Sequence, residues 1–288
     1  MKRIAIYGNR HQENYLGELG DFFGLLRSRG FEVTVASCFA SYLLEEGLER
    51  YWEKESQDFS EGVECVVSIG GDGTFLRAAQ WVGKREIPIL GINTGHLGFL
   101  ASYSLDEMNE LADVLANDLG SVEHRAVLEL QCDAMPADFW PYALNEVAVL
   151  KGESASMVTV TAGIDGEFLS DYLADGLVVA TPTGSTAYNL SAGGPILQPT
   201  LGCLVLSPLA PHSLTMRPLV VSGESRISLK ATQRDHQARV SLDGRSFILG
   251  EDCGELEIRR ADFSVAVLRR PGASFQTLLR DKLLWGKR

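Results

Sequence analysis

The stretch SIGGDGTFLR, Ser68–Arg77, joins an apolar run to a helix expected near 74–84 through three glycines and one aspartate. A strand that ends in such a turn suits phosphate binding, because glycine lets the backbone approach a ligand and the first N–H groups of a helix attract anions. The chain has neither a GxxxxGK(S/T) loop nor a GxGxxG turn opening a helix. The nearest cation in sequence is Arg77, so a bound phosphate would need Arg77, N–H groups and a divalent cation such as Mg²⁺.

The residues around this turn alternate between strand and helix patterns. The runs RIAIY and FEVTVA flank a segment with apolar residues at 15, 19, 22, 23 and 26, which form one helix face, with Gly30 at the position of a C-terminal cap. A second helix is expected over 39–54, IPILGIN reads as a further strand, and Ser104 with Glu107 forms a capping box before another helix. This alternation predicts an open α/β domain with a mostly parallel sheet over 1–120.

From about Glu123 the pattern changes to short strand-like runs separated by Gly, Pro, Asp or Ser. The runs are AVLELQC, ALNEVAVL, MVTVTAGI, GLVVATP, CLVLSP, RISLKA, ARVSLDG and FSVAVLR. Regularly spaced short strands predict an antiparallel, all-β, sandwich-like domain over 121–270. Residues 271–288 return to helical spacing, and we expect this C-terminal helix to pack back on the first domain.

Composition narrows the class of protein. The 288 residues exceed the usual single-domain size, and 45% of them are hydrophobic, so two cores are expected. A net charge of −12 argues against a general nucleic-acid or anionic-membrane partner. The five scattered cysteines contain no CxxC pair, and the histidines show no metal-site spacing, so no protein-only metal site is expected. No apolar run is long enough for a signal or a membrane span, and we expect a cytoplasmic protein.

Asp72 has two possible roles. Aspartate is favoured at helix N-caps, where its carboxylate accepts the first free N–H groups. It could instead be a general base that takes a proton from a hydroxyl attacking a phosphoryl group. The turn alone leaves both open.

A second segment, DGLVVATPTGSTAYNLSAGGPI, Asp175–Ile196, is dense in small and hydroxyl residues between two apolar runs. It offers hydroxyl groups for hydrogen bonding and the Tyr188 ring for stacking. The alternative is a connection in which the hydroxyls only cap and turn. So dense a run exceeds what a turn needs, which favours a ligand site.

A third candidate is Asn145-Glu146, inside the apolar run ALNEVAVL. Adjacent strand residues point to opposite faces, so one of the two is expected to face the interior, where a ribose or adenine would satisfy it. The alternative is that the pair lies at a strand end, in solvent.

Together these pieces resemble the NAD kinase family. Gly70–Thr74 is similar to a signature that the family shares with lipid kinases, and Asn145-Glu146 matches a second one. TPTGSTAYNLSAGGP at 181–195 matches a third that is specific to NAD kinases, with further similarity in NTGHLGFLA at 93–101 and PLAPHSLTMRPLV at 208–220. The resemblance implies an N-terminal α/β domain, a C-terminal β-rich domain and homodimers or homotetramers. It also implies ATP-dependent phosphorylation of the adenosine ribose 2′-hydroxyl of NAD, giving NADP.

Site residues follow from the same resemblance. Asp72 would accept the proton, with Gly73 beside it, and Arg77 would touch phosphate. Asn145 and Glu146 would hold the adenosine, and Asp175 would bond the nicotinamide side. The residues implied to line the dinucleotide are Thr186, Ala187, Tyr188, Asn189 and Ser191.

Two positions depart from the family pattern. Leu173 stands where many relatives carry a basic residue associated with the choice between NAD and NADH. Arg245 follows Asp243-Gly244 where the family often has glutamine, and its guanidinium could reach a phosphate or lie in solvent. The alternative functions are a lipid kinase of the same superfamily, which should lack the 181–195 segment, and a non-catalytic NAD(P)-binding sensor, which would not need Asp72.

Overall fold

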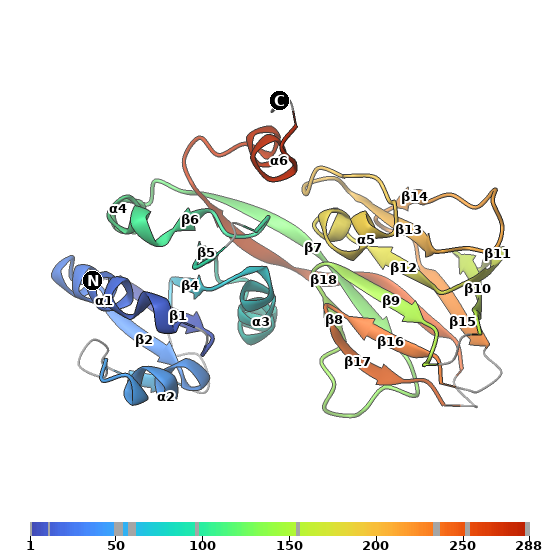
Figure 1. Ribbon diagram of the computed structural model, residues 1–288, viewed down its shortest axis with the longest axis horizontal. Helices are drawn as coiled ribbons and strands as arrows, with labels where there is room; N and C mark the ends of the chain where they lie inside the picture. Colours follow the sequence, from blue (N-terminus) through green and yellow to red (C-terminus); the bar gives the residue numbers. More distant parts are fainter. Residues whose placement is uncertain are drawn as a thin grey trace. The chain divides into compact units, whose positions relative to one another are not determined.

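The computed structural model describes residues 2–10, 12–48, 54–56, 62–95, 98–153, 156–232, 237–250 and 254–285. The chain forms two compact units (Figure 1). Unit 1 comprises Met1–His124 and Val265–Arg288, and unit 2 comprises Arg125–Ser264. Unit 1 is therefore built from two separate stretches of the chain.

Unit 1 contains a parallel sheet in the order β3-β2-β1-β4-β5. Its strands are β1 (Arg3–Gly8), β2 (Glu32–Ala36), β3 (Lys54–Ser56), β4 (Cys65–Ile69) and β5 (Ile89–Asn93). The last strand, β5, also pairs in parallel with β6 (Tyr103–Ser104) and, through Val267, with the end of β18 (Leu256–Arg269). Every residue of β4 and β5 is buried, as expected for a parallel sheet covered on both faces.

The helices of unit 1 follow the apolar spacing of the sequence. They are α1 (Leu16–Ser28), α2 (Ser37–Glu45), α3 (Asp72–Val82), α4 (Met108–Asn117) and α6 (Phe275–Leu283), with short 3-10 turns η1 (Glu13–Tyr15), η3 (Gly83–Arg85) and η4 (Leu105–Glu107). Side chains of α1, α2 and α4 share one core cluster with the sheet. Gly30, at φ +80°, follows the end of α1, and the predicted capping box of Ser104 and Glu107 is present.

The second helix is shorter than expected. A helix over 39–54 was wrong at its far end, because α2 stops at Glu45 and Lys54 begins strand β3. Gly47 takes φ +73°, and the N–H of Leu48 bonds the carbonyl of Leu43, which closes the helix. The apolar spacing alone did not show that this glycine ends the helix.

Unit 2 is a sandwich of two antiparallel sheets, which confirms the predicted fold class. One sheet runs β11-β10-β15-β18, with β7 pairing both β18 and β8, and the other runs β14-β13-β12-β9-β16-β17. One core cluster draws buried side chains from both sheets. The bounds are β7 (Ser121–Gln131), β8 (Tyr142–Ala143), β9 (Glu146–Leu150), β10 (Val158–Ile164), β11 (Glu167–Ala174), β12 (Gly176–Ala180), β13 (Cys203–Leu209), β14 (Leu219–Ser222), β15 (Ile227–Thr232), β16 (Arg239–Leu242) and β17 (Arg245–Ile248).

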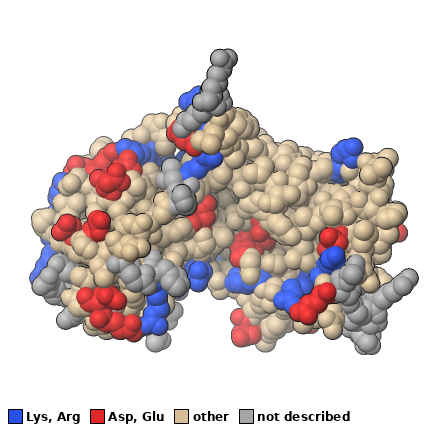
Figure 2. Space-filling model, viewed as in Figure 1, with Lys and Arg blue, Asp and Glu red and all other residues tan. Residues whose placement is uncertain are grey.

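The surface carries charges of both signs. On the face shown in Figure 2, the Lys and Arg side chains of the described residues are interspersed with Asp and Glu, and they form no broad basic field. A nucleic-acid-binding surface would need such a field. Within the described ranges, no helix is both long and apolar enough to cross a membrane.

Candidate functional site

The glycine turn connects β4 to α3 in unit 1. Gly70 has φ +144°, and a Cβ on it would lie 2.4 Å from Oγ1 of Thr74. That hydroxyl also accepts a hydrogen bond from Nδ2 of Asn9 at 3.1 Å. Only glycine fits at position 70, because the turn folds tightly over Thr74. Gly71 is the N-cap of α3, and Gly73 lies exposed in its first turn.

Asp72 is the first residue of α3 and does not cap it. Its carboxylate instead accepts hydrogen bonds from two backbone N–H groups, 2.8 Å from Phe99 and 3.1 Å from Leu100. A Cβ on Gly98 would lie 1.8 Å from Oδ1 of Asp72, so the chain passes directly against the carboxylate. The N-cap interpretation is therefore wrong, and the 98–100 segment fixes the orientation of Asp72.

Two cations of unit 1, Arg77 and Lys282, bear on the charge around Asp72. Arg77 is exposed one turn further along α3, where its Nε donates to the carbonyl of Gly73 at 3.4 Å. Lys282 on α6 feels the charge of Asp72, although 210 positions separate the two in the sequence. Burial lowers the pKa of Lys282 to about 8, while Asp72 and Asp281 oppose that shift. No local pattern in the sequence pointed to Lys282, because only the tertiary fold brings α6 near the turn.

Asn145 and Glu146 lie at the start of β9 in unit 2. Both are buried, with 9% and 8% of their surface exposed, so the interpretation as a solvent-exposed strand end is wrong. The Asp243 carboxylate holds this backbone, accepting N–H groups of Leu144 at 2.7 Å, Asn145 at 2.8 Å and Glu146 at 3.2 Å. Sequence reasoning missed Asp243 as a support of the pair.

The Glu146 carboxyl group is poorly satisfied within the protein. Its Oε2 is buried without a hydrogen-bond partner among the described residues, and a Tyr188 N–H bonds the carboxylate. Burial, followed by repulsion from Asp243, raises the pKa of Glu146 to about 8, against the effect of Tyr188. Glu146 therefore offers a ligand an acidic O–H donor as well as an acceptor.

The 181–195 segment lies directly on this pair. It follows β12 and contains the 3-10 turn η5 (Gly184–Thr186) and the short helix α5 (Tyr188–Ser191). A Cβ on Gly184 would lie 2.1 Å from the Asn145 carbonyl oxygen, and Oγ1 of Thr181 donates to the Leu144 carbonyl at 2.6 Å. The structure thus brings two of the predicted motifs together within unit 2.

The side chain of Asn189 is bonded to the protein and does not face a ligand site. Its side chain is fully buried and donates to the carbonyls of Ser185 at 3.0 Å and Pro195 at 3.1 Å, while its Oδ1 accepts from Ser207 at 2.7 Å. Its polar atoms therefore hold the segment in shape. Of the other predicted lining residues, Tyr188 and Ser191 are exposed, and Thr186 and Ala187 are half-buried.

Leu173 and Asp175 lie where β11 leads into β12. Leu173 is 43% exposed, and its carbonyl accepts the N–H of His212 at 2.8 Å. Asp175 forms an ion pair with Nζ of Lys151 at 2.8 Å. Lys151 thus brings a positive charge to Asp175, and sequence reasoning missed it.

Arg245 neither lies in solvent nor points at an open site. Its guanidinium donates to the carbonyls of Trp140 at 2.9 Å and Tyr142 at 2.7 Å, and lies 5.3 Å from the centre of the Phe139 ring. Burial lowers its pKa, while Asp243 raises it. The role expected at a phosphate is therefore replaced by one that ties β17 to the 139–142 segment.

Comparisons with known protein families also divide the chain into an N-terminal and a C-terminal part. The model of the ATP-NAD kinase N-terminal domain matches residues 21–119, and that of the ATP-NAD kinase C-terminal domain matches 144–270. The NAD kinase of Bacteroides fragilis is 44% identical over 290 residues, covering 99% of this chain and 98% of that one. The NAD kinase of Flavobacterium johnsoniae is 39% identical with the same coverage of both chains.

Two solved structures share the fold. An NAD kinase from Archaeoglobus fulgidus in complex with ATP has a TM-score of 0.75 and 31% identity, covering 99% of this chain and all of that one. Yeast NADH kinase complexed with NADH has a TM-score of 0.87 at 24% identity, covering all of this chain and 89% of that one.

Proposed function

Because the chain belongs to the ATP-NAD kinase family, we propose that it transfers the γ-phosphoryl group of ATP to the 2′-hydroxyl of the adenosine ribose of NAD, giving NADP. The observation that carries this proposal is the Asp72 carboxylate, held on the glycine turn by two backbone N–H groups. Relatives support both substrates, since the solved NAD kinase at 31% identity is complexed with ATP and the curated relatives at 39–44% identity are NAD kinases.

Asp72 serves as the general base in this proposal. A carboxylate has about four acceptor positions, and the N–H groups of Phe99 and Leu100 take two of them. The remaining positions are free to take the proton of the ribose hydroxyl as that oxygen attacks the γ-phosphorus. The two N–H bonds prevent rotation of the carboxylate, which keeps its free positions aimed in one direction.

Unit 2 supplies recognition of the dinucleotide. Asn145 and Glu146 bind the adenosine, and a polar group of the ligand would satisfy the buried Oε2 of Glu146, which has no hydrogen-bond partner among the described residues. Asp175 bonds the nicotinamide side. The accessible residues Thr186, Ala187, Tyr188 and Ser191 line the dinucleotide.

Mg²⁺ would be bound mainly through the substrate phosphates. No group of three or more His, Cys, Asp or Glu side chains in the described part of the chain could hold a metal alone. Magnesium suits such a site, because it keeps several waters and binds through few protein groups together with substrate phosphates. Asp72 serves as the general base, so phosphate oxygens and water would hold the ion, which would neutralise phosphate charge. We also assign the chain to a homodimer or homotetramer, which light scattering on the purified protein tests.

NADP formation with Mg²⁺-ATP tests the proposal, with NAD and NADH compared as acceptors. Asp72→Asn should lower turnover by roughly 10²–10⁴-fold and leave the Kd for NAD within about threefold. Asp21→Asn, an exposed aspartate on α1 of the same unit, is the matched control and should keep full turnover.

Several results would contradict this function. Unchanged turnover of the Asp72 variant together with lost NAD binding would contradict the role of Asp72 as general base. No NADP from the natural chain, with NAD still bound, would indicate a sensor. Product from NAD alone would instead support the function and show that Leu173 does not abolish the choice of NAD over NADH. Equal product from both would also support a kinase and would point to Leu173 as the position to test for relaxed choice.

A further inference from the structure

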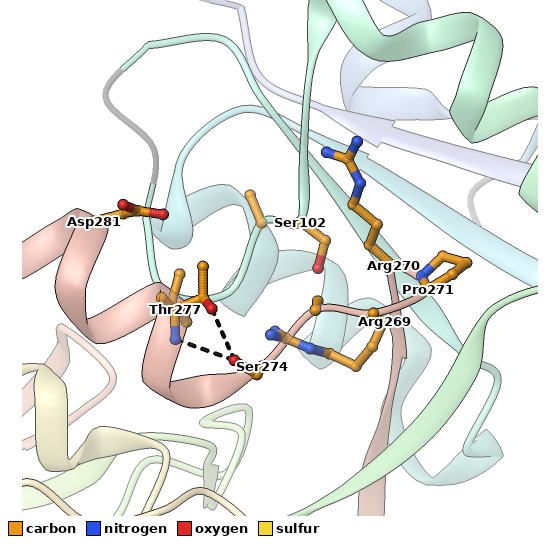
Figure 3. Close-up of a pocket in the computed structure, with 11 residues that line it drawn as sticks. Ser102, Arg269, Arg270, Pro271, Ser274, Thr277 and Asp281 are labelled. Atoms are coloured by element: carbon orange, nitrogen blue, oxygen red, sulfur yellow. Dashed lines mark hydrogen bonds between the residues drawn. The ribbon is translucent and has the colours of Figure 1, made fainter.

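Unit 1 contains a second candidate binding site, a cavity of about 280 Å³. Residues 101–102, the end of β18 with the 270–274 turn, and one face of α6 line it (Figure 3). All of these residues belong to unit 1. The proposed kinase chemistry assigns no role to any of them.

Arg269 supplies a buried cation to this cavity. The residue is 8% exposed, and Figure 3 shows its guanidinium extending into the cavity toward Ser274. Its ion pair with Glu123 is long, at 3.7 Å between Nε and Oε2, and no other described residue hydrogen-bonds it. A guanidinium has five N–H donors, and one long ion pair leaves donors of Arg269 available to an anion in the cavity.

Ser102 supplies an unused hydroxyl. Its Oγ is buried with no hydrogen-bond partner among the described residues. At the first turn of α6, the hydroxyls of Ser274 and Thr277 are 2.9 Å apart, and Ser274 accepts the Thr277 N–H at 3.1 Å. Polar groups therefore approach the cavity from three separate segments of the chain. A tetrahedral oxyanion suits donors from three directions better than a planar carboxylate, because its oxygens do not lie in one plane.

The two remaining charges limit the position of the ligand. Arg270 turns away from the cavity in Figure 3, because it pairs with Glu107 and Glu110 and lies 5.2 Å from the centre of the Tyr103 ring. Asp281 lines the side formed by α6 and would repel an anion there. The anion is therefore expected at the end of the cavity that holds Arg269.

We propose that this cavity binds a phosphate group, either inorganic phosphate or the phosphate of a small ester, through Arg269 and Ser102. The site is coupled to Asp72 by covalent continuity, because Ala101 and Ser102 directly follow the two residues whose N–H groups hold the Asp72 carboxylate. A phosphate bound to Ser102 would also restrain this loop. The proposal does not depend on the kinase assignment.

Calorimetric titration with inorganic phosphate, without nucleotide, tests the site. Arg269→Met should weaken binding at least tenfold, and Ser102→Ala by roughly 2–10-fold, as for the loss of one neutral hydrogen bond. Arg269→Lys should restore part of the affinity. Glu123→Gln should tighten binding several-fold, because it removes the carboxylate that competes for the guanidinium. A purely structural role of Arg269 would not produce that gain.

The matched control is Arg27→Met, an exposed arginine on α1 of the same unit, which should keep full affinity for phosphate. Arg77→Met reports binding at the glycine turn: loss of phosphate binding in that variant, with Arg269→Met and Ser102→Ala unaffected, would overturn the proposal by placing the anion at the turn. Absence of binding to the natural chain up to about 10 mM phosphate would overturn it as well. Should Arg269→Met fail to fold, the Ser102 and Glu123 variants decide the question. Glycerol 3-phosphate is titrated in parallel, and tighter binding of the ester would assign an organic phosphate, weaker binding the free ion.

Discussion

Replacing Glu146 by glutamine should make the protein more stable at alkaline pH. In the folded chain the carboxyl group is 8% exposed, lies near Asp243 and has a pKa of about 8, well above its ordinary value of 4.5. Between these two values the folded state holds a proton that the unfolded chain has released. Folding stability must therefore fall as pH rises through this window.

The size of the effect follows from the two pKa values. One pKa unit corresponds to 1.36 kcal/mol, so ionising Glu146 in the folded state costs up to about 5 kcal/mol relative to the unfolded chain. Most of this cost falls between pH 5 and pH 9. Glutamine does not ionise. Between pH 5 and pH 9 the free energy of unfolding of the variant should therefore rise by roughly 4 kcal/mol relative to that of the natural chain.

Urea unfolding of the ligand-free protein at pH 5, 7 and 9, followed by circular dichroism, measures this difference. Glu167→Gln, an exposed glutamate in the same unit, is the control and should change little with pH. A Glu146→Gln advantage that stays constant within about 1 kcal/mol from pH 5 to pH 9 would refute the reasoning. It would mean that the folded protein accepts the charge at Glu146 without cost.

Three further predictions concern other positions. Gly98→Ala should push the Asp72 carboxylate aside and lower turnover about 100-fold with little change in Tm. Gly95→Ala is its control and should leave turnover unchanged, because the space around its Cβ is open; equal turnover in both variants would contradict the geometry. Asn189→Ala breaks three buried hydrogen bonds and should lower the free energy of unfolding by about 2–4 kcal/mol in urea, and a loss below about 0.5 kcal/mol would show that they contribute little. Lys282 should titrate near pH 8, because burial disfavours its charge; NMR of ¹³C-methylated lysines measures this, Lys282→Arg identifies the signal, and a midpoint near 10.5 would contradict it.

Much of the fold was predictable because it depends on local spacing. The apolar face of α1, the capping box before α4 and the alternating runs of unit 2 each express a preference of consecutive residues. The unexpected strands β11, β14 and β17 lack that signal. They carry many exposed residues, and each is an edge strand that pairs with the strand directly before it in the chain, so cross-strand pairing and not apolar alternation gives the strand conformation.

The site was predictable only where its functional residues are consecutive in the sequence. The glycine turn and the 181–195 segment are such motifs. Asp243, Lys151 and Lys282 act through contacts that only the folded chain creates, so no reading of neighbouring residues could find them. The same limit explains the incorrect expectation for the Asn189 side chain. It lies within a motif typical of ligand binding, and the sequence does not show that its amide bonds to the protein.

The discontinuity of unit 1 has a consequence for its synthesis on the ribosome. Strand β5 emerges early, yet its partner on β18 is residue Val267, almost 180 positions later. Unit 2 is a continuous stretch and can collapse while translation continues, whereas the helix that carries Lys282 is made after it. A nascent chain stalled before residue 265 would therefore display Asp72 without Lys282 and without the Arg269 cavity. The surroundings of Asp72 would therefore be completed only when the last few dozen residues have been made.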